Sequence, residues 1–255
     1  MNRSTAKEMM DAPDNPRDLL EDDLRNLRII NRYLGNYRSV LRGVKRIVEE
    51  QKLSHFSLLD VGTGSGDIPV KIAAWARRKN LAARLIALDP EPITLRAAVH
   101  QTADYPEIAL VQGDGRALPF ATGSFDFVLS SQMLHHFSEE GVIHLLRGWS
   151  RVARRAIIVS DLIRHPVAYH GVRLLTKVFT RNIMTRTDAP LSVERAFTLK
   201  EWRALFERAG IGPFRIFPIF PFRQMTLFSM MERDSPSQQC GHSDILRVPS
   251  VTPGV

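Results

Sequence analysis

Three glycines at alternate positions, Gly62, Gly64 and Gly66, lie in the stretch LLDVGTGSGD, between an apolar run and a segment with helical spacing. Such a loop lets the backbone approach a ligand closely, because glycine has no side chain to block it. The dinucleotide pattern G-x-G-x-x-G needs a further glycine where the chain has Asp67, and the Gly-Lys-Ser/Thr of a P-loop is missing. An aspartate at a helix N-terminus would also repel a phosphate. The loop therefore indicates a ligand without a phosphate at this point.

Two aspartates follow later strand-like segments, in ALDPEP and VQGDGRALPF. Asp89 ends the second of these segments, where an acidic side chain of a parallel sheet can accept both hydroxyl groups of a ribose. Asp114 ends the third and is placed to accept an exocyclic amine or to meet a ring edge. The glycine loop and the two acids describe a nucleoside that has no phosphate and can carry a positive charge. S-adenosylmethionine fits this description.

Strand-like and helix-like segments alternate between residues 56 and 162. This alternation predicts a parallel sheet with helices on both faces, in which ligands bind at the carboxyl ends of the strands. The strand-like segments are FSLLDV, ARLIALD, IALVQGD, SFDFVLSS and AIIVSDL, and the helix-like segments are IPVKIAAWARRKN, ITLRAAVHQTA and EEGVIHLLRGWSRV.

The flanking segments complete one domain over residues 18–231. Apolar residues at helical spacing within the N-terminal part, 18–52, predict two helices that meet near Gly35. An insertion, 164–197, precedes the helix-like TLKEWRALFERAG and two strand-like runs, FRIFPIF and RQMTLFSM, which we expect to pair as an antiparallel hairpin. Residues 1–17 are expected to be flexible and the polar residues 232–255 to form a disordered tail.

The composition is that of a globular protein. With 255 residues, 44% of them hydrophobic, the chain can bury a core without disulfides or a structural metal. Its single cysteine, Cys240, excludes an intrachain disulfide and a cysteine-rich zinc site, so no metal is expected. Neither a secretory signal nor a membrane-spanning apolar run is found, which favours the cytoplasm. The net charge of +8 suggests an anionic partner, but the arginines are spread along the chain.

Four segments, LLDVGTGSGD, ALDPEP, VQGDGRALPF and FDFVLSSQMLHHF, resemble the successive motifs of class I S-adenosylmethionine-dependent methyltransferases. The resemblance covers residues 58–162 and is to the small-molecule type that includes ubiquinone and menaquinone methyltransferases. It implies a Rossmann-like, doubly wound sheet of seven strands with an antiparallel last strand, and S-adenosylmethionine as the cofactor. The cofactor contacts that it implies are Asp60, Gly62, Gly64, Gly66, Asp89, Pro90, Asp114, Gly115, Ser130 and Ser131.

A pair of histidines, His135 and His136, follows the fourth strand-like segment. Methyl transfer is a displacement at an already activated carbon, so alignment of the acceptor and exclusion of water are the main requirements. An acceptor with a phenol-like pKa also benefits from a base, and histidine suits neutral pH. Many relatives that act on small molecules carry a histidine in this turn, and His136 matches that position best. The alternative is a histidine that only packs or shapes the pocket.

The insertion 164–197 is a candidate lid over a small-molecule acceptor. Its stretch VAYHGVRLLTKVF has the spacing of an amphipathic helix, with Tyr169, Leu174, Leu175, Val178 and Phe179 on or near one face. The residues expected to contact the acceptor are Arg164, His165, Tyr169 and His170. These features favour a lipophilic, hydroxylated aromatic acceptor, such as a polyketide-derived or quinone-like phenol, methylated on oxygen or, as the second choice, on a ring carbon.

Signatures for nucleic acid acceptors are missing, because no Asn/Asp-Pro-Pro-Tyr/Phe follows the fourth strand and no cysteine lies near the site. Two alternatives stay open. The first is an RNA or protein methyltransferase that uses the basic surface. The second is a non-catalytic binding module that retains the fold, although the intact cofactor acids argue against it.

Overall fold

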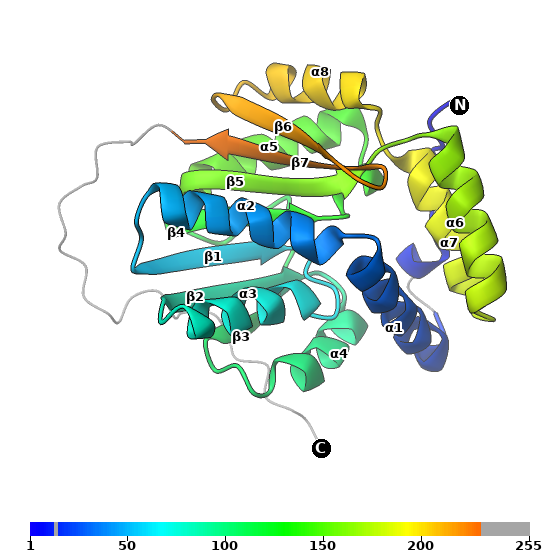
Figure 1. Ribbon diagram of the computed structural model, residues 1–255, viewed down its shortest axis with the longest axis horizontal. Helices are drawn as coiled ribbons and strands as arrows, with labels where there is room; N and C mark the ends of the chain where they lie inside the picture. Colours follow the sequence, from blue (N-terminus) through cyan, green and yellow to red (C-terminus); the bar gives the residue numbers. More distant parts are fainter. Residues whose placement is uncertain (13–14, 231–255) are drawn as a thin grey trace.

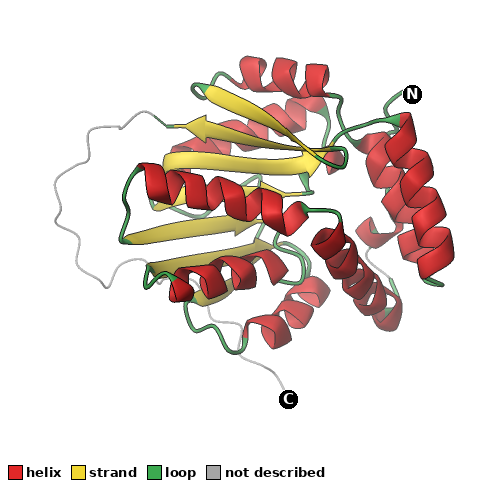
Figure 2. Cartoon of the chain, in the orientation of Figure 1, coloured by secondary structure: helices red, strands yellow, loops and turns green. Residues whose placement is uncertain are grey.

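The computed structural model describes residues 1–12 and 15–230, and within them seven strands form one sheet (Figures 1 and 2). The strand order is β3-β2-β1-β4-β5-β7-β6, in which β7 runs antiparallel to both of its neighbours and the pairs from β3 to β5 are parallel. This confirms the predicted doubly wound sheet. The strands are β1 (His55–Val61), β2 (Ala82–Asp89), β3 (Ile108–Gln112), β4 (Phe125–Ser131), β5 (Ala153–Leu162), β6 (Phe214–Ile219) and β7 (Arg223–Ser229).

Helices cover both faces of the sheet, because the central strands are apolar on both sides. One face packs against α2 and α3 through residues such as Val44 and Ile72, and the other against α5 and α8 through Trp149 and Trp202. These helices are α2 (Asn36–Glu50), α3 (Asp67–Arg78), α5 (Glu139–Val152) and α8 (Leu199–Ala209). Every residue of β4 is buried, so the strand end that carries the histidine pair has a rigid base.

Of the remaining helices, α1 (Arg17–Tyr33), α6 (Pro166–Phe179) and α7 (Ile183–Arg195) gather beyond the carboxyl ends of the parallel strands, to the right in Figure 1. Helix α4 (Pro92–Thr102) packs against β2, β3 and α3. The two short helices are η1 (Met9–Asp11) and η2 (Leu134–His136). As expected, α1 and α2 meet at Gly35, whose left-handed φ of +81° turns the chain between them. None of the described helices combines the length and apolar character needed to cross a bilayer.

The N-terminal segment differs from the sequence prediction of a flexible region. Arg3 donates hydrogen bonds to the carbonyl oxygens of His135 and Phe137, at 3.0 and 2.7 Å, and Glu8 is buried. The backbone N–H groups of Met9 and Met10 each donate to the Asp188 carboxylate at 2.9 Å. These contacts attach the segment to α7 and η2. The predicted disordered tail, residues 232–255, and Cys240 lie outside the described residues.

The insertion holds two helices rather than the one that the sequence predicts. Thr180, Arg181 and Asn182 separate α6 from α7, and the Asn182 side chain caps α7 by accepting the Thr185 N–H at 3.0 Å. Pro190 lies inside α7. Because a proline ordinarily argues against a helix interior, the sequence does not indicate this second helix. Since α6 and α7 pack side by side, the insertion is a helical hairpin over the site.

Candidate active site

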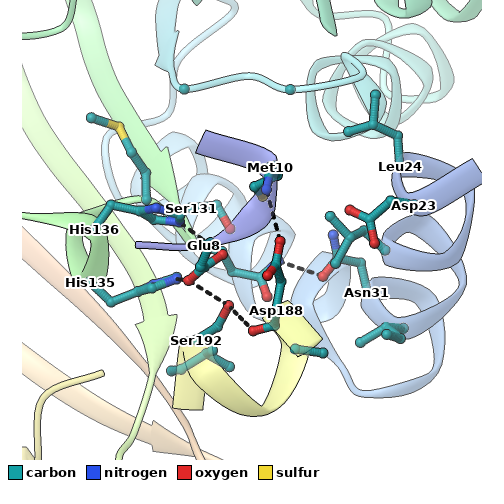
Figure 3. Close-up of a pocket in the computed structure, with 18 of the residues that line it drawn as sticks. Glu8, Met10, Asp23, Leu24, Asn31, Ser131, His135, His136, Asp188 and Ser192 are labelled. Carbon is teal, nitrogen blue, oxygen red and sulfur yellow. Dashed lines mark hydrogen bonds and ion pairs between the residues drawn. The ribbon is translucent and has the colours of Figure 1, made fainter. Parts of the chain in front are cut away.

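A cavity of about 680 Å³ opens at the carboxyl ends of β1, β2, β3 and β4 (Figure 3). The loops that follow these strands form its floor, and the N-terminal segment, α1, α6 and α7 form its walls. The volume lies in the range of roughly 300–1,000 Å³ that is usual for small-ligand sites. The cavity therefore lies where an open parallel sheet places its ligands.

The glycine loop contributes backbone to this floor. Gly64 lines the cavity with a left-handed φ of +57°, and a Cβ added there would meet no protein atom within 4 Å. Its backbone is therefore open to a ligand. Gly62 also lines the cavity. Gly66 does not, because its Cα packs against α4, where an added Cβ would lie 3.2 Å from the Ala98 and Thr102 side chains.

Asp89 lies at the edge of the cavity with its carboxylate already engaged. Oδ2 accepts the Gly64 N–H at 2.8 Å, while Oδ1 accepts the Glu91 N–H at 3.0 Å and the Thr94 hydroxyl at 2.9 Å. Burial raises the pKa of Asp89, and these hydrogen bonds oppose the rise. A carboxylate has about four acceptor positions, so one is free on Oδ2. The geometry therefore leaves room for one further hydrogen bond, whereas the sequence predicts two from a ribose.

The other predicted cofactor residues lie around this loop in different ways. Pro90, Asp114, Gly115 and Ser131 line the cavity. Asp60 does not, because it is fully buried beneath the loop, where it accepts the Thr63 hydroxyl at 2.7 Å and where burial raises its pKa to about 7. Ser130 is likewise turned away and donates to the Val61 carbonyl oxygen at 3.1 Å. Asp60 and Ser130 thus shape the loop rather than face the cavity.

Asp114 is paired with an arginine within its own turn. The Arg116 Nε donates to Asp114 Oδ2 at 2.8 Å, and this hydrogen bond holds the pKa of the Asp114 carboxyl below its usual value. The pair is half exposed, with side-chain exposures of 42% for Asp114 and 64% for Arg116, so the pairing is weak and can rearrange around a ligand.

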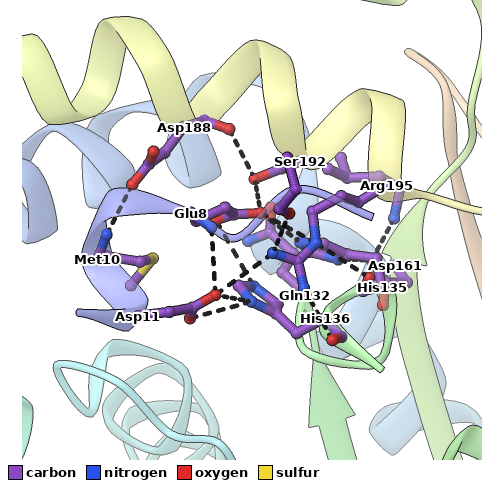
Figure 4. Close-up of polar contacts among 12 residues, drawn as sticks. Glu8, Met10, Asp11, Gln132, His135, His136, Asp161, Asp188, Ser192 and Arg195 are labelled. Atoms are coloured by element: carbon purple, nitrogen blue, oxygen red, sulfur yellow. Dashed lines mark hydrogen bonds and ion pairs between the residues drawn. The ribbon is translucent and has the colours of Figure 1, made fainter. Parts of the chain in front are cut away.

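The histidine pair lines the cavity above the end of β4 (Figure 4). His135 is 2% exposed, and its Nδ1 lies 2.7 Å from Asp161 Oδ1. Because a carboxylate accepts hydrogen bonds, this contact places the imidazole proton on Nδ1 and leaves the Nε2 lone pair free. Nε2 has no hydrogen-bond partner and lies 3.8 Å from Glu8 Oε1. His135 is therefore a buried imidazole held by a carboxylate, with a free basic nitrogen.

His136 has a different environment, although its ring lies 4.5 Å from that of His135, measured between centroids. Its side chain is 20% exposed, its Nδ1 lies 3.3 Å from Asp11 Oδ1, and its Nε2 lies 3.7 Å from Glu8 Oε2. Both ring nitrogens thus face carboxylates of the N-terminal segment. The sequence favours His136 as the base, whereas the geometry gives the free nitrogen to His135.

Sequence reasoning missed the charged side chains that complete this site, Glu8, Asp11, Asp188 and Arg195. Arg195, from α7, donates to the His136 carbonyl oxygen at 2.8 Å, and its guanidinium lies 3.3 Å from Asp11 and 3.9 Å from Glu8. Burial raises the pKa of Glu8 to about 7, although His136, Ser192 and Arg195 oppose the rise. The N-terminal segment therefore lines the candidate site.

Glu8, His135 and His136 each offer one metal-binding atom, and these atoms lie within 4.8 Å of one another. A divalent cation could use such a set of donors. However, the Arg195 guanidinium already lies beside the carboxylates of Glu8 and Asp11, so the chain itself supplies a positive charge there. The cluster thus combines three possible donor atoms with a positive charge of the chain's own.

Comparison with known proteins identifies the domain. Residues 58–156 match the protein family described as Methyltransferase domain. A demethylmenaquinone methyltransferase from Roseiflexus sp. (strain RS-1) is 32% identical over 117 residues, which cover 44% of this chain and 46% of that protein. The chain thus spans about half the length of the curated relative that it matches. Residues 58–156 thus match a methyltransferase domain, in agreement with the class I S-adenosylmethionine-dependent type that the sequence resembles.

Solved structures of methyltransferases share the fold of this chain. A methyltransferase from Aquifex aeolicus is 15% identical, with a TM-score of 0.58 over 83% of this chain and 98% of that one. Magnesium protoporphyrin IX methyltransferase from Synechocystis PCC 6803, with bound S-adenosylhomocysteine, is 16% identical, with a TM-score of 0.55 over 82% and 86%. The cofactor of this class, S-adenosylmethionine, fits the residues present, because Gly64 leaves its backbone open and Asp89 retains one acceptor position.

The four residues predicted to contact the acceptor do not line the cavity of the methyltransferase. Arg164 is buried in an ion pair with Glu201 at 2.6 Å, and the exposed His165 caps α6 by accepting the Val167 N–H. Tyr169 and His170 contact each other edge to face on a different side of α6. The cavity is instead lined by a stripe of small and apolar residues on α6, namely Val167, Ala168, Gly171, Val172 and Leu175.

The lid residues Leu174, Val178 and Phe179 are also misplaced by the sequence prediction, because they point to solvent. Neighbouring residues of an α-helix are turned by about 100°, so Leu174 and Leu175 cannot both face the cavity. The structure assigns the inner position to Leu175.

The burial of Glu8 makes the attachment of the N-terminal segment pH-dependent. Its pKa of about 7 lies above the ordinary value of 4.5, so the attached segment favours the protonated carboxyl. The stabilisation of the attached segment by protonated Glu8 is complete below about pH 4.5 and is lost as the pH rises to about 7. We expect thermolysin cleavage near Met9 and Met10 to accelerate from pH 5 to pH 7, by up to about tenfold per pH unit, and then to level off.

Glu8→Gln is the matched variant for this measurement, because it retains the same histidines, Asp11 and Arg195. Its cleavage rate should lack the steep rise, and the ratio of the two rates isolates the Glu8 contribution from the pH response of the protease. Identical pH profiles for the two proteins would contradict the assignment.

Proposed function

We propose that the chain transfers a methyl group from S-adenosylmethionine to a hydroxyl group of a small, lipophilic aromatic molecule. The observation that supports this proposal is one cavity lined by the glycine loop, by His135, whose Nε2 has no hydrogen-bond partner, and by the apolar stripe of α6. A ring carbon activated by a hydroxyl group is the second candidate acceptor. The name of the Roseiflexus relative, a demethylmenaquinone methyltransferase, agrees with a quinone-like acceptor.

The bound cofactor would supply a methyl group on a positively charged sulfur. The chain's own residues then have three tasks. His135 Nε2 accepts the proton of the acceptor hydroxyl, and the Asp161 carboxylate holds the imidazole and stabilises its charged form. The Glu8 side chain, which lies beside the Arg195 guanidinium, provides a polar contact next to that hydroxyl.

The third task is to orient the ring and exclude water. The apolar stripe of α6 faces the histidines across the cavity, and Leu20, Leu24 and Leu27 of α1 extend the apolar wall. Positioning of this kind supplies a large part of the rate enhancement when the reacting carbon is already activated. The N-terminal segment closes the site toward α7. A concave, mostly apolar cavity suits a small molecule better than a macromolecular chain.

The test measures methyl transfer to a panel of phenols and hydroquinones with alkyl chains of increasing length. We expect Leu175→Ser to raise the KM for the acceptor by about tenfold or more, because it removes roughly 1.5–3 kcal/mol of apolar contact. The affinity for S-adenosylmethionine should stay unchanged.

The matched control is Leu174→Ser, the same substitution at the neighbouring, solvent-facing position. With water-soluble acceptors, this variant should leave both the KM for the acceptor and the affinity for S-adenosylmethionine unchanged. Lack of transfer to every phenol by the wild-type enzyme would refute the proposed function. Equal effects of the two variants would refute the position of the acceptor along α6.

A further inference from the structure

Helix α6 presents an exposed apolar surface at the outer edge of the molecule (Figure 1). Its side chains Leu174, Val178 and Phe179 are 65%, 65% and 78% exposed, and Ile183 at the start of α7 is 56% exposed. Single exposed apolar residues are common on protein surfaces, but neighbouring ones on a single helical hairpin indicate a contact surface. We call these four residues the outer patch.

The outer patch adjoins the cavity. Leu174 and Val178 are four residues apart and therefore lie on one stripe of α6, beside the stripe with Val172 and Leu175 that lines the cavity. Phe179, four residues after Leu175, continues this second stripe to the exposed end of the helix. Apolar surface thus continues around the helix from the outside of the molecule to the acceptor site. A lipophilic molecule could follow this path without crossing water.

Charge distinguishes this surface from the rest of the chain. Between Asp161 and Asp188 the sequence contains no acidic residue, but it has exposed basic residues at Arg173, Lys177 and Arg181. Lys177 and Arg173 flank the apolar stripe of α6, which gives the helix one apolar and one basic side. Amphipathic helices with this composition lie in the surface of anionic bilayers, with the apolar side among the lipid chains.

We propose that the outer patch docks the enzyme on an anionic lipid bilayer, from which the acceptor enters the cavity along α6. The proposal rests on the proposed function, because a lipophilic acceptor is the molecule that a bilayer would hold. A second copy of the chain is a poorer occupant, since a two-fold contact would bring the same basic residues together. A nucleic acid would use the charges but not the apolar side chains.

The experiment is flotation of the full-length protein with vesicles of phosphatidylcholine alone or with an equal part of phosphatidylglycerol. We expect binding to the anionic vesicles, weaker binding in high salt, and at least a tenfold loss of affinity for Leu174→Ser combined with Phe179→Ser. Lys177→Glu should weaken binding to anionic vesicles only. Val99→Ser, which changes an exposed valine on α4, is the matched control and should bind as wild type.

Activity separates this proposal from the proposed function. The Leu174/Phe179 double variant should methylate a water-soluble phenol at the wild-type rate and lose activity only with a vesicle-embedded acceptor. Absence of vesicle binding by the wild-type protein would overturn the docking proposal and leave the function intact. So would dimerisation through the outer patch in light scattering, or equal binding of the double variant and wild type.

Discussion

Replacement of His135 by alanine should slow single-turnover methyl transfer by about 10²–10⁴-fold, with little change in the affinity for S-adenosylmethionine. His135 lines the cavity, its Nε2 is buried without a hydrogen-bond partner, and its Nδ1 is held by Asp161 at 2.7 Å. Without this base, an un-ionised phenol must lose its proton to water. Rapid-quench measurement of the methylated product in a single turnover reports this step directly.

Acceptors of graded pKa distinguish a base from a residue that only positions the ring. Phenols with electron-withdrawing substituents are ionised near neutral pH, so His135→Ala should recover most of its activity with them, and also at raised pH. Asp161→Asn should show a milder defect of the same kind, because it disturbs the tautomer and orientation of His135.

His136→Ala is the control, since both of its ring nitrogens face carboxylates of the N-terminal segment. Its defect should be smaller and independent of the acceptor pKa. If the rate of methyl transfer depended on acceptor pKa in the same way for the wild type and both variants, general-base catalysis would be excluded. Positioning and desolvation would then explain the catalysis.

The sheet and the position of the cavity at its edge could be predicted from the sequence because their signals are local. The run from Leu58 to Asp60 is apolar and then acidic, the glycines follow at once, and Asp89 and Asp114 repeat the strand-then-acid order. Residues at the carboxyl ends of neighbouring parallel strands lie close together, and this does not depend on how the side chains pack. The positions of these residues thus follow from strand order alone, as the cavity edge at Gly64 and Asp89 illustrates.

The acceptor side could not be predicted in the same way, because it depends on contacts between distant parts of the chain. Glu8 approaches His135 across 127 positions of sequence, and Asp188 binds Met9 and Met10 across nearly the whole domain. Acidic, proline-rich sequence ordinarily indicates flexibility. In this chain, the backbone N–H groups and carboxylates of the N-terminal segment contact side chains of α7 and η2. No local sequence pattern indicates these contacts.

The lid illustrates a different limit. Helical spacing in VAYHGVRLLTKVF correctly indicates an amphipathic helix, but Leu174 and Leu175 lie on adjoining faces and both faces are apolar. The sequence therefore cannot say which leucine faces the cavity. The packing of α6 against α7 fixes the rotation of the helix and places Leu175 inside.

Replacement of Asp89 by asparagine should weaken the binding of S-adenosylmethionine by about 30-fold to 1,000-fold, equivalent to about 2–4 kcal/mol. The carboxylate accepts three hydrogen bonds from Gly64, Glu91 and Thr94, and it keeps one acceptor position for the ribose. An amide nitrogen in place of either oxygen would face a donor, so the variant loses the ribose contact or disturbs the Gly64 backbone that approaches the ligand. Isothermal titration calorimetry measures the affinity.

Asp126→Asn is the matched control, because Asp126 is also a buried carboxylate that accepts a backbone N–H, that of Ser57 at 2.8 Å. It lies at the start of β4, at the end of the strand opposite to the cavity. Both variants should lower the thermal unfolding temperature, but only Asp89→Asn should lose cofactor affinity. If a folded Asp89→Asn protein bound S-adenosylmethionine as tightly as the wild type does, Asp89 would be a loop residue that holds Gly64 and Thr94 and does not bind the ribose.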